Sequence, residues 1–492
     1  MKSSYATNMI AGVFLATTAH AIPTPAFPQS YSLPELDLST PIRDQGHLGD
    51  CWAFGSTAAF ESALLVAGIG SGPSDPAIDL SEWHLATRSG IEPDLTPDAQ
   101  GKYDDWGGNT LLSISYWSRG RGAWDISPDS SIPVLGGGPV RDSQNPLNVY
   151  PIDAISNQEN LAPYIPPASQ PSAYRLTGSY EFNQTNPYSG VTYSDSQQVE
   201  RIKGAISAYG ALATGFNVEL GTFSSATING VEYPDAHYIY TGSAEGDHEV
   251  AIVGWDDTVE IQGANSPGAW LVKNSWGTSH GYNGYIYVSY EDTHLGKTNN
   301  WAVEASTMDG FSDMPLQNQY IVPDHGYTDL DVVTAASRLA PDADGQLAAV
   351  GIYTWVEGQD VNISIYGGWD ENTNEPINPF AGMSFSESLV EIGYHLLNLP
   401  FTLDFLADDE IVIVVEYDVN DTTTLLADDN SPVSSDVSYM FDGTNWIDLA
   451  SMPTPGTFFV KGLTLVPEPA HYALLAGVAL LAMVSLRRRR TA

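Results

Sequence analysis

The chain has 492 residues, too many for one ordinary domain, and this length predicts two or three domains. Hydrophobic residues make up 42% and aromatic residues 11% of the chain, which excludes a largely disordered protein. It has 60 acidic and 18 basic residues; so acidic a surface repels phosphates, and we expect no nucleic-acid partner. The excess of acid is either an adaptation for solubility or a means of steering cationic substrates.

Residues 1–21 have the organisation of a signal peptide. Lys2 supplies a positive charge, residues 9–16 form a short apolar run, and Ala19-His20-Ala21 is a small-x-small cleavage site. The apolar run is too short to span a bilayer, which disfavours the alternative of a membrane anchor. We therefore expect an exported protein that begins near Ile22. Residues 22–38 are then a Pro-rich lead-in segment, too short to fold as an inhibitory prodomain.

Residues 39–308 are predicted to form one domain of mixed α and β structure. A first helix is expected over residues 50–67, because apolar residues recur there with helical spacing. Its buried face should comprise Phe60, Ala63, Leu64 and Ala67. Residues 120–195 are rich in Pro, Ser, Asn and Gly and predict long inserted loops. A second helix is expected over residues 196–209, followed by strands over residues 249–254, 269–273 and 285–290.

The chain has a single cysteine, Cys51, so it can form no intramolecular disulfide. Cys51 lies at the start of the first predicted helix, within Gln45-Gly46-His47-Leu48-Gly49-Asp50-Cys51-Trp52-Ala53-Phe54. Unpaired N–H groups and the helix dipole at this position favour the reactive thiolate, so we expect a lowered thiol pKa. Asp50 either opposes the thiolate or caps the helix and points away.

Two polar residues stand at the ends of apolar strands further along the chain. His248 begins the run His248-Glu249-Val250-Ala251-Ile252-Val253-Gly254-Trp255, and Asn274 ends another strand in Lys273-Asn274-Ser275-Trp276-Gly277. An Asn side-chain oxygen can accept the imidazole N–H and so fix its tautomer and direction. Trp276 would shield that hydrogen bond from water.

These three blocks, in this order, resemble the signature of the papain family of cysteine peptidases, over about residues 35–305. The resemblance implies an α+β fold with a two-lobed domain, one lobe helical and one β-barrel-like. It also implies roles for four residues: Cys51 as nucleophile, His248 as base, Asn274 as the residue that orients His248, and Gln45 in the oxyanion hole. Substrate-binding candidates are Gly107, Gly108, Asp247 and Trp276.

The sequence also departs from the pattern of that family. Leu48 stands where a disulfide cysteine is usual, and Asp50 stands where a small residue is usual. His248 follows Cys51 by 248 − 51 = 197 residues, more than the roughly 130–150 of the family signature. The expected function is an exported peptidase acting on proteins or peptides without a metal or cofactor. A catalytically degenerate protein that binds polysaccharide or a surface is the alternative, and a transferase or amidase is a third reading.

Residues 309–465 are predicted to be all β and to close as a β-sandwich. Strands are expected over residues 347–355, 361–366, 410–417 and 457–465. This segment is similar to the lectin-like domain that follows the peptidase domain in some bacterial papain-type proteins, so it either braces the first domain or binds polysaccharide. Asp342-Ala343-Asp344-Gly345 is compatible with calcium, although acidic turns are common in so acidic a chain.

Residues 466–492 combine Val466-Pro467-Glu468-Pro469, an apolar stretch over residues 470–486, and four arginines at residues 487–490. The arrangement resembles the PEP-CTERM sorting signal of Gram-negative bacteria. It implies recognition and trimming by an exosortase, with a permanent membrane anchor as the alternative. In both cases the body of the protein faces away from the cytoplasm, in the cell envelope, at the cell surface or secreted.

Overall fold

The computed structural model describes residues 27–45, 49–88, 107–118, 174–186, 190–219, 222–308, 311–313, 325–327, 333–341, 344–418, 425–428, 435–453, 455, 457–458 and 460–465. The predicted signal peptide and the predicted sorting tail lie outside these ranges. Within these ranges, no helix combines the length and the apolar character needed to cross a membrane. We call the described part up to residue 308 the mixed region and the part from residue 311 the β region; the domain boundaries themselves stay predictions.

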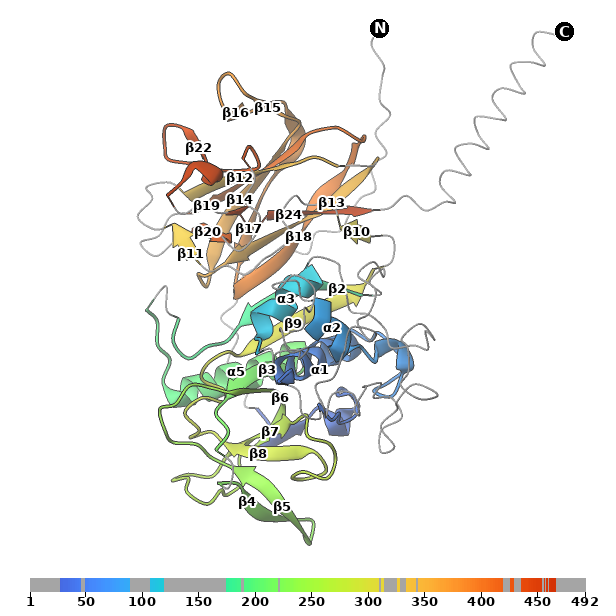
Figure 1. The fold of residues 1–492 in the computed structure, drawn as a ribbon, viewed down its shortest axis with the longest axis vertical. Coiled ribbons are helices and arrows are strands. Elements are labelled where there is room, and N and C mark those ends of the chain that lie inside the picture. The colour runs from blue at the N-terminus through green and yellow to red at the C-terminus, as the bar shows by residue number, and fades with distance from the viewer. Residues whose placement is uncertain are drawn as a thin grey trace, which may run out of the picture.

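The mixed region contains the helices and lies below the β region in Figure 1. Its helices are α1 (Cys51–Val66), α2 (Glu82–Arg88), α3 (Thr110–Ser118) and α5 (Asp195–Tyr209). Its strands are β1 (Ser30–Ser32), β2 (Tyr174–Glu181), β3 (Leu212–Phe216), β4 (Ser224–Ile228), β5 (Val231–Tyr238), β6 (His248–Asp256), β7 (Ala269–Lys273), β8 (Tyr285–Ser289) and β9 (Trp301–Thr307). The two predicted helices and the three predicted strands of this region are confirmed. Strand β2 falls inside the segment predicted as loops, and that part of the prediction is wrong.

Helix α1 is central to the mixed region and is buried around its whole circumference. Every residue from Trp52 to Leu65 is buried, so the prediction of one buried face is too narrow. Ala67, predicted to be buried, is exposed just beyond the helix. Helix α5 is amphipathic instead, and it begins with a capping box in which Ser194 and Gln197 satisfy each other's backbone N–H groups.

The β region consists of strands and two sheets cover its core. Its strands are β10 (Phe311–Asp313), β11 (His325–Tyr327), β12 (Val333–Leu339), β13 (Gly345–Thr354), β14 (Gln359–Tyr366), β15 (Trp369–Asp370), β16 (Glu375–Pro376), β17 (Pro379–Leu389), β18 (Ile392–Phe405), β19 (Ile411–Tyr417), β20 (Leu425–Asp428), β21 (Ser438–Phe441), β22 (Trp446–Asp448), β23 (Thr457–Phe458) and β24 (Val460–Leu465). A six-stranded sheet in the order β17-β14-β19-β12-β21-β22 shares one apolar core with β13, β18 and β24 of a second sheet. This two-layer arrangement agrees with the predicted sandwich.

The second sheet does not end at the β region but continues through the mixed region. Its thirteen strands include the path β10-β24-β13-β18-β2-β9-β3-β6-β7-β8-β5-β4, and β18 pairs antiparallel with β2 at the junction. The register there matches Ile392 with Glu181 and His395 with Gly178. One sheet therefore joins the two regions.

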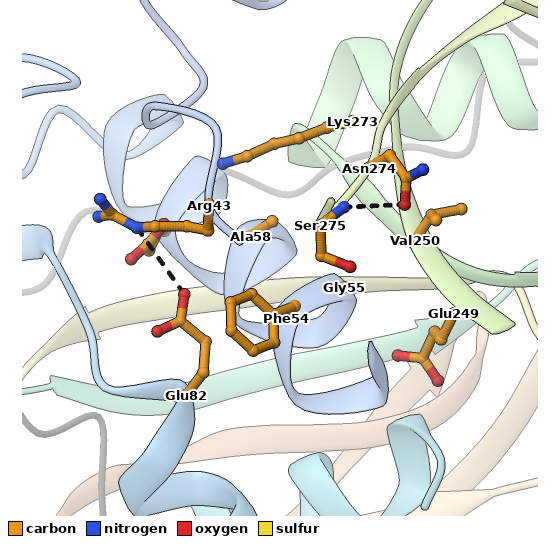
Figure 2. Close-up of a pocket in the computed structure, with 11 residues that line it drawn as sticks. Arg43, Phe54, Gly55, Ala58, Glu82, Glu249, Val250, Lys273, Asn274 and Ser275 are labelled. Carbon is orange, nitrogen blue, oxygen red and sulfur yellow. Dashed lines mark hydrogen bonds and ion pairs between the residues drawn. The ribbon is translucent and has the colours of Figure 1, made fainter. Parts of the chain in front are cut away.

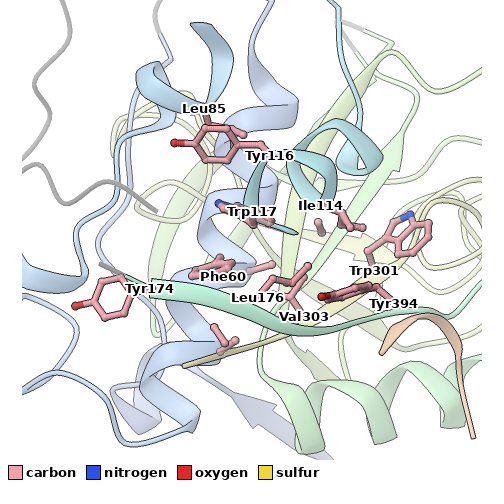
Figure 3. Close-up of a cluster of buried hydrophobic side chains, with 14 of the residues drawn as sticks. Phe60, Leu85, Ile114, Tyr116, Trp117, Tyr174, Leu176, Trp301, Val303 and Tyr394 are labelled. Atoms are coloured by element: carbon pink, nitrogen blue, oxygen red, sulfur yellow. The ribbon is translucent and has the colours of Figure 1, made fainter. Parts of the chain in front are cut away.

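Side chains reinforce this junction on both faces of the sheet. One apolar cluster contains Phe60, Trp117 and Leu176 of the mixed region together with Tyr353 and Tyr394 of the β region (Figure 3). Polar contacts add to it: the Arg201 guanidinium lies 2.6 Å from the Glu357 carboxylate. The buried ammonium of Lys461 donates to the carbonyl of Ser118 at the end of α3. The β region therefore packs directly against the helices that flank the candidate site.

Candidate active site

The thiol of Cys51 lies at the N-terminus of α1 and beside the start of β6. Its Sγ accepts a hydrogen bond from the backbone N–H of Glu249 at 3.4 Å. Asp50 occupies the N-cap position and is buried, yet its side chain makes no capping hydrogen bond to α1. Of the two readings of Asp50, the structure supports a carboxyl group that opposes the thiolate, since its charge raises the pKa of Cys51.

His248 and Asn274 lie side by side because β6 and β7 are neighbouring antiparallel strands. The Nε2 atom of His248 is 2.9 Å from Oδ1 of Asn274. The indole of Trp276 stacks on the imidazole, with ring centroids 4.8 Å apart. Both polar side chains are buried, at 8% and 2% exposure for His248 and Asn274. With Oδ1 as acceptor, Nε2 carries the proton, so Nδ1 is the nitrogen that can accept one.

Gln45 is held against the segment that follows β7. Its backbone N–H donates to the carbonyl of Ser275 at 2.8 Å, and its side-chain oxygen accepts from Ser275 Oγ at 2.5 Å. Because the oxygen is engaged in this way, the amide NH₂ is the end of the side chain suited to donate to an oxyanion. Its role in the oxyanion hole stays a prediction.

Cys51 and His248 open onto one cleft. The cavity has a volume of about 530 Å³ and is lined by Gly49, Cys51, Gly107, Gly108, Asn109, Gly215, Glu245, Gly246, Asp247, His248, Glu249, His294, Thr298 and Asn299. The structure therefore brings Gly107, Gly108 and Asp247 together with the thiol, while Trp276 lies behind His248. A Cβ at Gly108 would come within 2.5 Å of the Trp52 indole, so this position requires glycine. The substrate-binding roles of these residues stay predictions.

Burial controls the protonation of the two central groups. Desolvation raises the pKa of the Cys51 thiol to about 12; the N–H of Glu249 lowers it, and the carboxyl groups of Glu249 and Asp50 raise it. Desolvation also lowers the pKa of His248 to about 4, against the hydrogen bond to Asn274, which raises it. The expectation of a lowered thiol pKa is therefore wrong for this structure, because burial outweighs the helix N-terminus. The pair is neutral, and proton transfer must accompany attack by sulfur.

A cluster of buried charges lies next to the site, and Glu249 stands between it and the cleft. Arg43 pairs with Asp79 and lies 3.9 Å from Glu82, while the Lys273 ammonium donates to Thr40 Oγ1 at 2.8 Å. Four of the charged groups, Arg43, Glu61, Glu82 and Lys273, line an internal pocket that also reaches Asn274, Ser275 and Glu249 (Figure 2). Burial raises the pKa of Glu82 to about 8 and lowers that of Lys273 to about 8. Lys273 immediately precedes Asn274, so the cluster helps to fix the position of Asn274.

Sequence reasoning missed this cluster and missed Glu249. The members come from positions 43, 61, 79, 82 and 273, and nothing in their local sequence shows that they meet. Within the described ranges, no group of three or more His, Cys, Asp or Glu side chains is arranged to hold a metal ion. Asp342 of the suggested calcium turn lies outside those ranges.

Part of the chain also matches a known protein family. Residues 152–306 match the family model described as papain family cysteine protease. This part of the chain is similar to a papain-family protease domain. The match contains His248 and Asn274 and begins after Cys51. It supports a peptidase function at the level of the family, and it spans about a third of the chain.

Individual relatives are distant. A cysteine protease of Blomia tropicalis is 26% identical over 274 residues, covering 56% of this chain and 65% of the relative. Human cathepsin O is 25% identical, covering 54% of this chain and 63% of the relative. The chain thus spans slightly less than two thirds of the length of these curated relatives.

A solved structure shares the fold of both regions. It contains the cysteine protease and lectin-like domains of Cwp84, a surface layer associated protein of Clostridium difficile. The TM-score is 0.64 at 22% identity, and the match covers 90% of this chain and 89% of that chain. This likeness establishes a fold in which a papain-like part and a lectin-like part occur together.

Proposed function

We propose that this protein is an exported cysteine peptidase that hydrolyses peptide bonds through Cys51, His248 and Asn274. One observation carries the proposal: His248 lines the same cleft as Cys51, and its imidazole is held from behind by a 2.9 Å hydrogen bond to Asn274 and by the stacked indole of Trp276. An imidazole with a fixed tautomer beside a thiol at a helix N-terminus is the arrangement that thiol acyl transfer requires. The match to the papain family supports the same reaction.

The proposed reaction depends on Nδ1 of His248, the imidazole nitrogen that can accept the thiol proton. Sulfur of Cys51 attacks the peptide carbonyl while its proton moves to Nδ1 of His248, giving a tetrahedral oxyanion and an imidazolium. The NH₂ group of Gln45 and the backbone N–H of Cys51 would stabilise the oxyanion. The imidazolium then protonates the leaving amine, and a thioester forms. Water, deprotonated by His248, releases the acid and restores the thiol.

The test is turnover of a peptide library by residues 22–465, compared with the Cys51→Ala variant. We expect cleavage by the wild-type protein and its loss, by at least a thousand-fold, in the variant, because the residual rate without a nucleophile is small. Mass analysis of the products separates hydrolysis from acyl transfer and so tests the transferase reading. Undiminished cleavage by Cys51→Ala would refute the proposal.

The second candidate is a binding protein with a degenerate papain-like part. The observation that favours it is the Cys51 thiol, whose pKa burial and two neighbouring carboxyl groups raise to about 12. This candidate predicts binding to an insoluble polysaccharide by both the wild-type protein and Cys51→Ala, with no peptide turnover by either. Detectable turnover that depends on Cys51 would exclude it.

For the β region we propose a bracing role, supported by the shared sheet and the Lys461–Ser118 contact. Polysaccharide binding is a further possibility suggested by the lectin-like part of the Cwp84 structure. We also propose that the protein is exported and that an exosortase processes residues 466–492. The proposed domain boundaries are 39–308 and 309–465. Mass determination of the protein isolated from its host would test both predicted processing sites.

A further inference from the structure

Glu249 is a buried carboxyl group next to the thiol, and the reaction described above gives it no task. Its backbone N–H is the donor to Cys51 Sγ at 3.4 Å. Successive side chains of a strand point to opposite faces, so His248 faces Asn274 and Trp276 while Glu249 faces α1. Ser56 Oγ of α1 donates to Glu249 Oε1 at 2.8 Å.

The space around Glu249 is closely filled. Its exposure is 7%, and a Cβ at Gly55 would come within 3.1 Å of Glu249 Cγ. The carboxyl group therefore lies against the second turn of α1, one turn from the thiol. It lines both the cleft that contains Cys51 and the internal pocket of Figure 2, so it stands between the two.

Among the described residues, no cationic side chain forms an ion pair with Glu249. The described titratable and charged groups that surround it are Asp50 at the N-cap of α1, Cys51 and Glu61 on α1, Arg43 before α1, Glu82 on α2, Lys273 on β7, and Glu245, Asp247, His248 and His294 around the cleft. The hydrogen bond from Ser56 favours its ionised form, but burial is stronger and raises the pKa of Glu249 to about 8. A neutral acid at physiological pH is the result.

We propose that Glu249 is a positioning residue that controls when Cys51 can ionise: a neutral Glu249 permits the thiolate, and an ionised Glu249 opposes it. Two adjacent buried acids cannot both lose a proton at low cost, so the first to ionise suppresses the second. The charge of Glu249 raises the pKa of Cys51 more than that of Asp50 does. Thiol reactivity is thereby limited at alkaline pH. This inference deepens the proposed function, because it concerns the same nucleophile.

The test is the rate of iodoacetamide alkylation between pH 6 and about pH 12, a range that reaches the pKa of Cys51, measured by mass spectrometry of the peptide that contains Cys51. Cys51 is the only cysteine, so the label reports on this thiol alone. In Glu249→Gln the midpoint should move down by about one pH unit, which corresponds to a roughly ten-fold faster reaction below the midpoint. Glu181→Gln is the matched control: it also replaces a buried glutamate, but on β2, and it should leave the midpoint unchanged.

Ser56→Ala keeps the test decisive if Glu249→Gln does not fold. It removes the donor that stabilises the Glu249 carboxylate, so Glu249 stays neutral to higher pH. The alkylation rate just above pH 8, where Glu249 ionises in the wild type, should therefore exceed the wild-type rate, by less than in Glu249→Gln. An unchanged rate profile in both variants, or an equal change in Glu181→Gln, would overturn the inference. Alkylation needs no peptide substrate. A shifted alkylation profile without peptide hydrolysis would support this inference and refute the proposed function. Peptide hydrolysis with an unshifted profile would support the proposed function and refute this inference.

Discussion

The mixed region and the β region differ in what they bury. Among the described residues, every buried carboxyl group lies in the mixed region: Asp50, Glu61, Asp79, Glu82, Glu181, Glu249 and Asp292. The core between the two sheets of the β region consists of apolar side chains. Its one buried lysine, Lys461, reaches out of that core to bond Ser118 of the mixed region.

Buried carboxyl groups lower the stability of the mixed region, so we interpret them as features that serve function. Taking an ion out of water costs several kcal/mol unless partners compensate it, and an apolar core of the same volume avoids that cost. Apart from Glu181 and Asp292, the buried carboxyl groups lie near Asn274 and Cys51, which is where perturbed pKa values would serve chemistry. The β region has the composition of a region built for packing and support.

Separating the two regions should have the largest effect. A chain ending at residue 308 would expose the edge of β2, which pairs with β18, and the apolar face that Tyr353 and Tyr394 cover. We expect loss of cooperative folding or aggregation, because an open apolar edge strand is prone to associate. The measurement is thermal unfolding followed by circular dichroism, with a chain ending at residue 465 as control. A soluble fragment with an unchanged Tm would show that the regions fold independently.

Replacing a buried cation should have the next largest effect. Arg43→Met removes a guanidinium whose side chain is 4% exposed and leaves Asp79 and Glu82 buried without it. We expect the free energy of unfolding to fall by about 3–5 kcal/mol, the usual result of breaking a buried ion pair from one side. Urea denaturation measures it.

Arg338→Met is the matched substitution in the β region. Arg338 lies 2.8 Å from Glu371 and 2.5 Å from Glu410; these carboxylates are 62% and 31% exposed, and Arg338 itself is 16% exposed. Because solvent reaches and screens both pairs, the expected loss is smaller, about 1 kcal/mol. Equal losses in Arg43→Met and Arg338→Met would contradict the contrast drawn between the regions.

Loss of the residue that orients His248 should reduce activity more than stability. Asn274→Ala removes the acceptor 2.9 Å from Nε2, so the imidazole can turn away from the thiol. We expect kcat/KM for a peptide substrate to fall about 100-fold, the scale of a small misplacement of a catalytic group. Asn362→Ala on β14, which removes the acceptor of the Ser386 hydroxyl, should leave kcat/KM unchanged. Comparable losses in both variants would argue against an orienting role.

Local sequence predicted the elements with strong apolar patterns, and it failed where distant segments decide the outcome. Helix α1 and strands β6, β7 and β8 were predictable because their apolar runs are long and bounded. The polar, largely exposed strand β17 gives no such signal. The pairing of residues 178–181 with residues 392–395 joins segments more than two hundred positions apart.

The residues of the candidate site also differ in how well local sequence predicted them. Cys51, His248 and Asn274 stand in recognisable blocks; the first two line one cleft, and Asn274 forms a hydrogen bond with His248. Glu249 was part of such a block, yet its task depends on Ser56 and Gly55, which meet it only in the folded chain. The raised thiol pKa was unpredictable for the same reason, since burial is a property of the whole fold.

The smallest effect should appear at the junction, where Glu181 is paired with Ile392 of the β region. Burial raises the pKa of Glu181 from 4.5 to about 7, against the hydrogen bond from Asn183 and the charge of Arg201, which lower it. Between these two values the folded state binds more protons than the unfolded state, so this group makes the free energy of unfolding fall as pH rises. Glu181→Gln removes this contribution to the pH dependence of the free energy of unfolding.

The Tm of Glu181→Gln minus that of the wild type should therefore increase from pH 4.5 to pH 7, by roughly 2–4 °C for each kcal/mol. Taking the difference matters because Glu82 and Glu249, both with raised pKa values, act in the same direction in both proteins. The exposed Glu416 of β19 provides the control, and Glu416→Gln should give a difference independent of pH. A difference for Glu181→Gln that is equally flat would mean that this carboxyl group is solvated at the junction, and that the two regions are less tightly joined than their shared sheet implies.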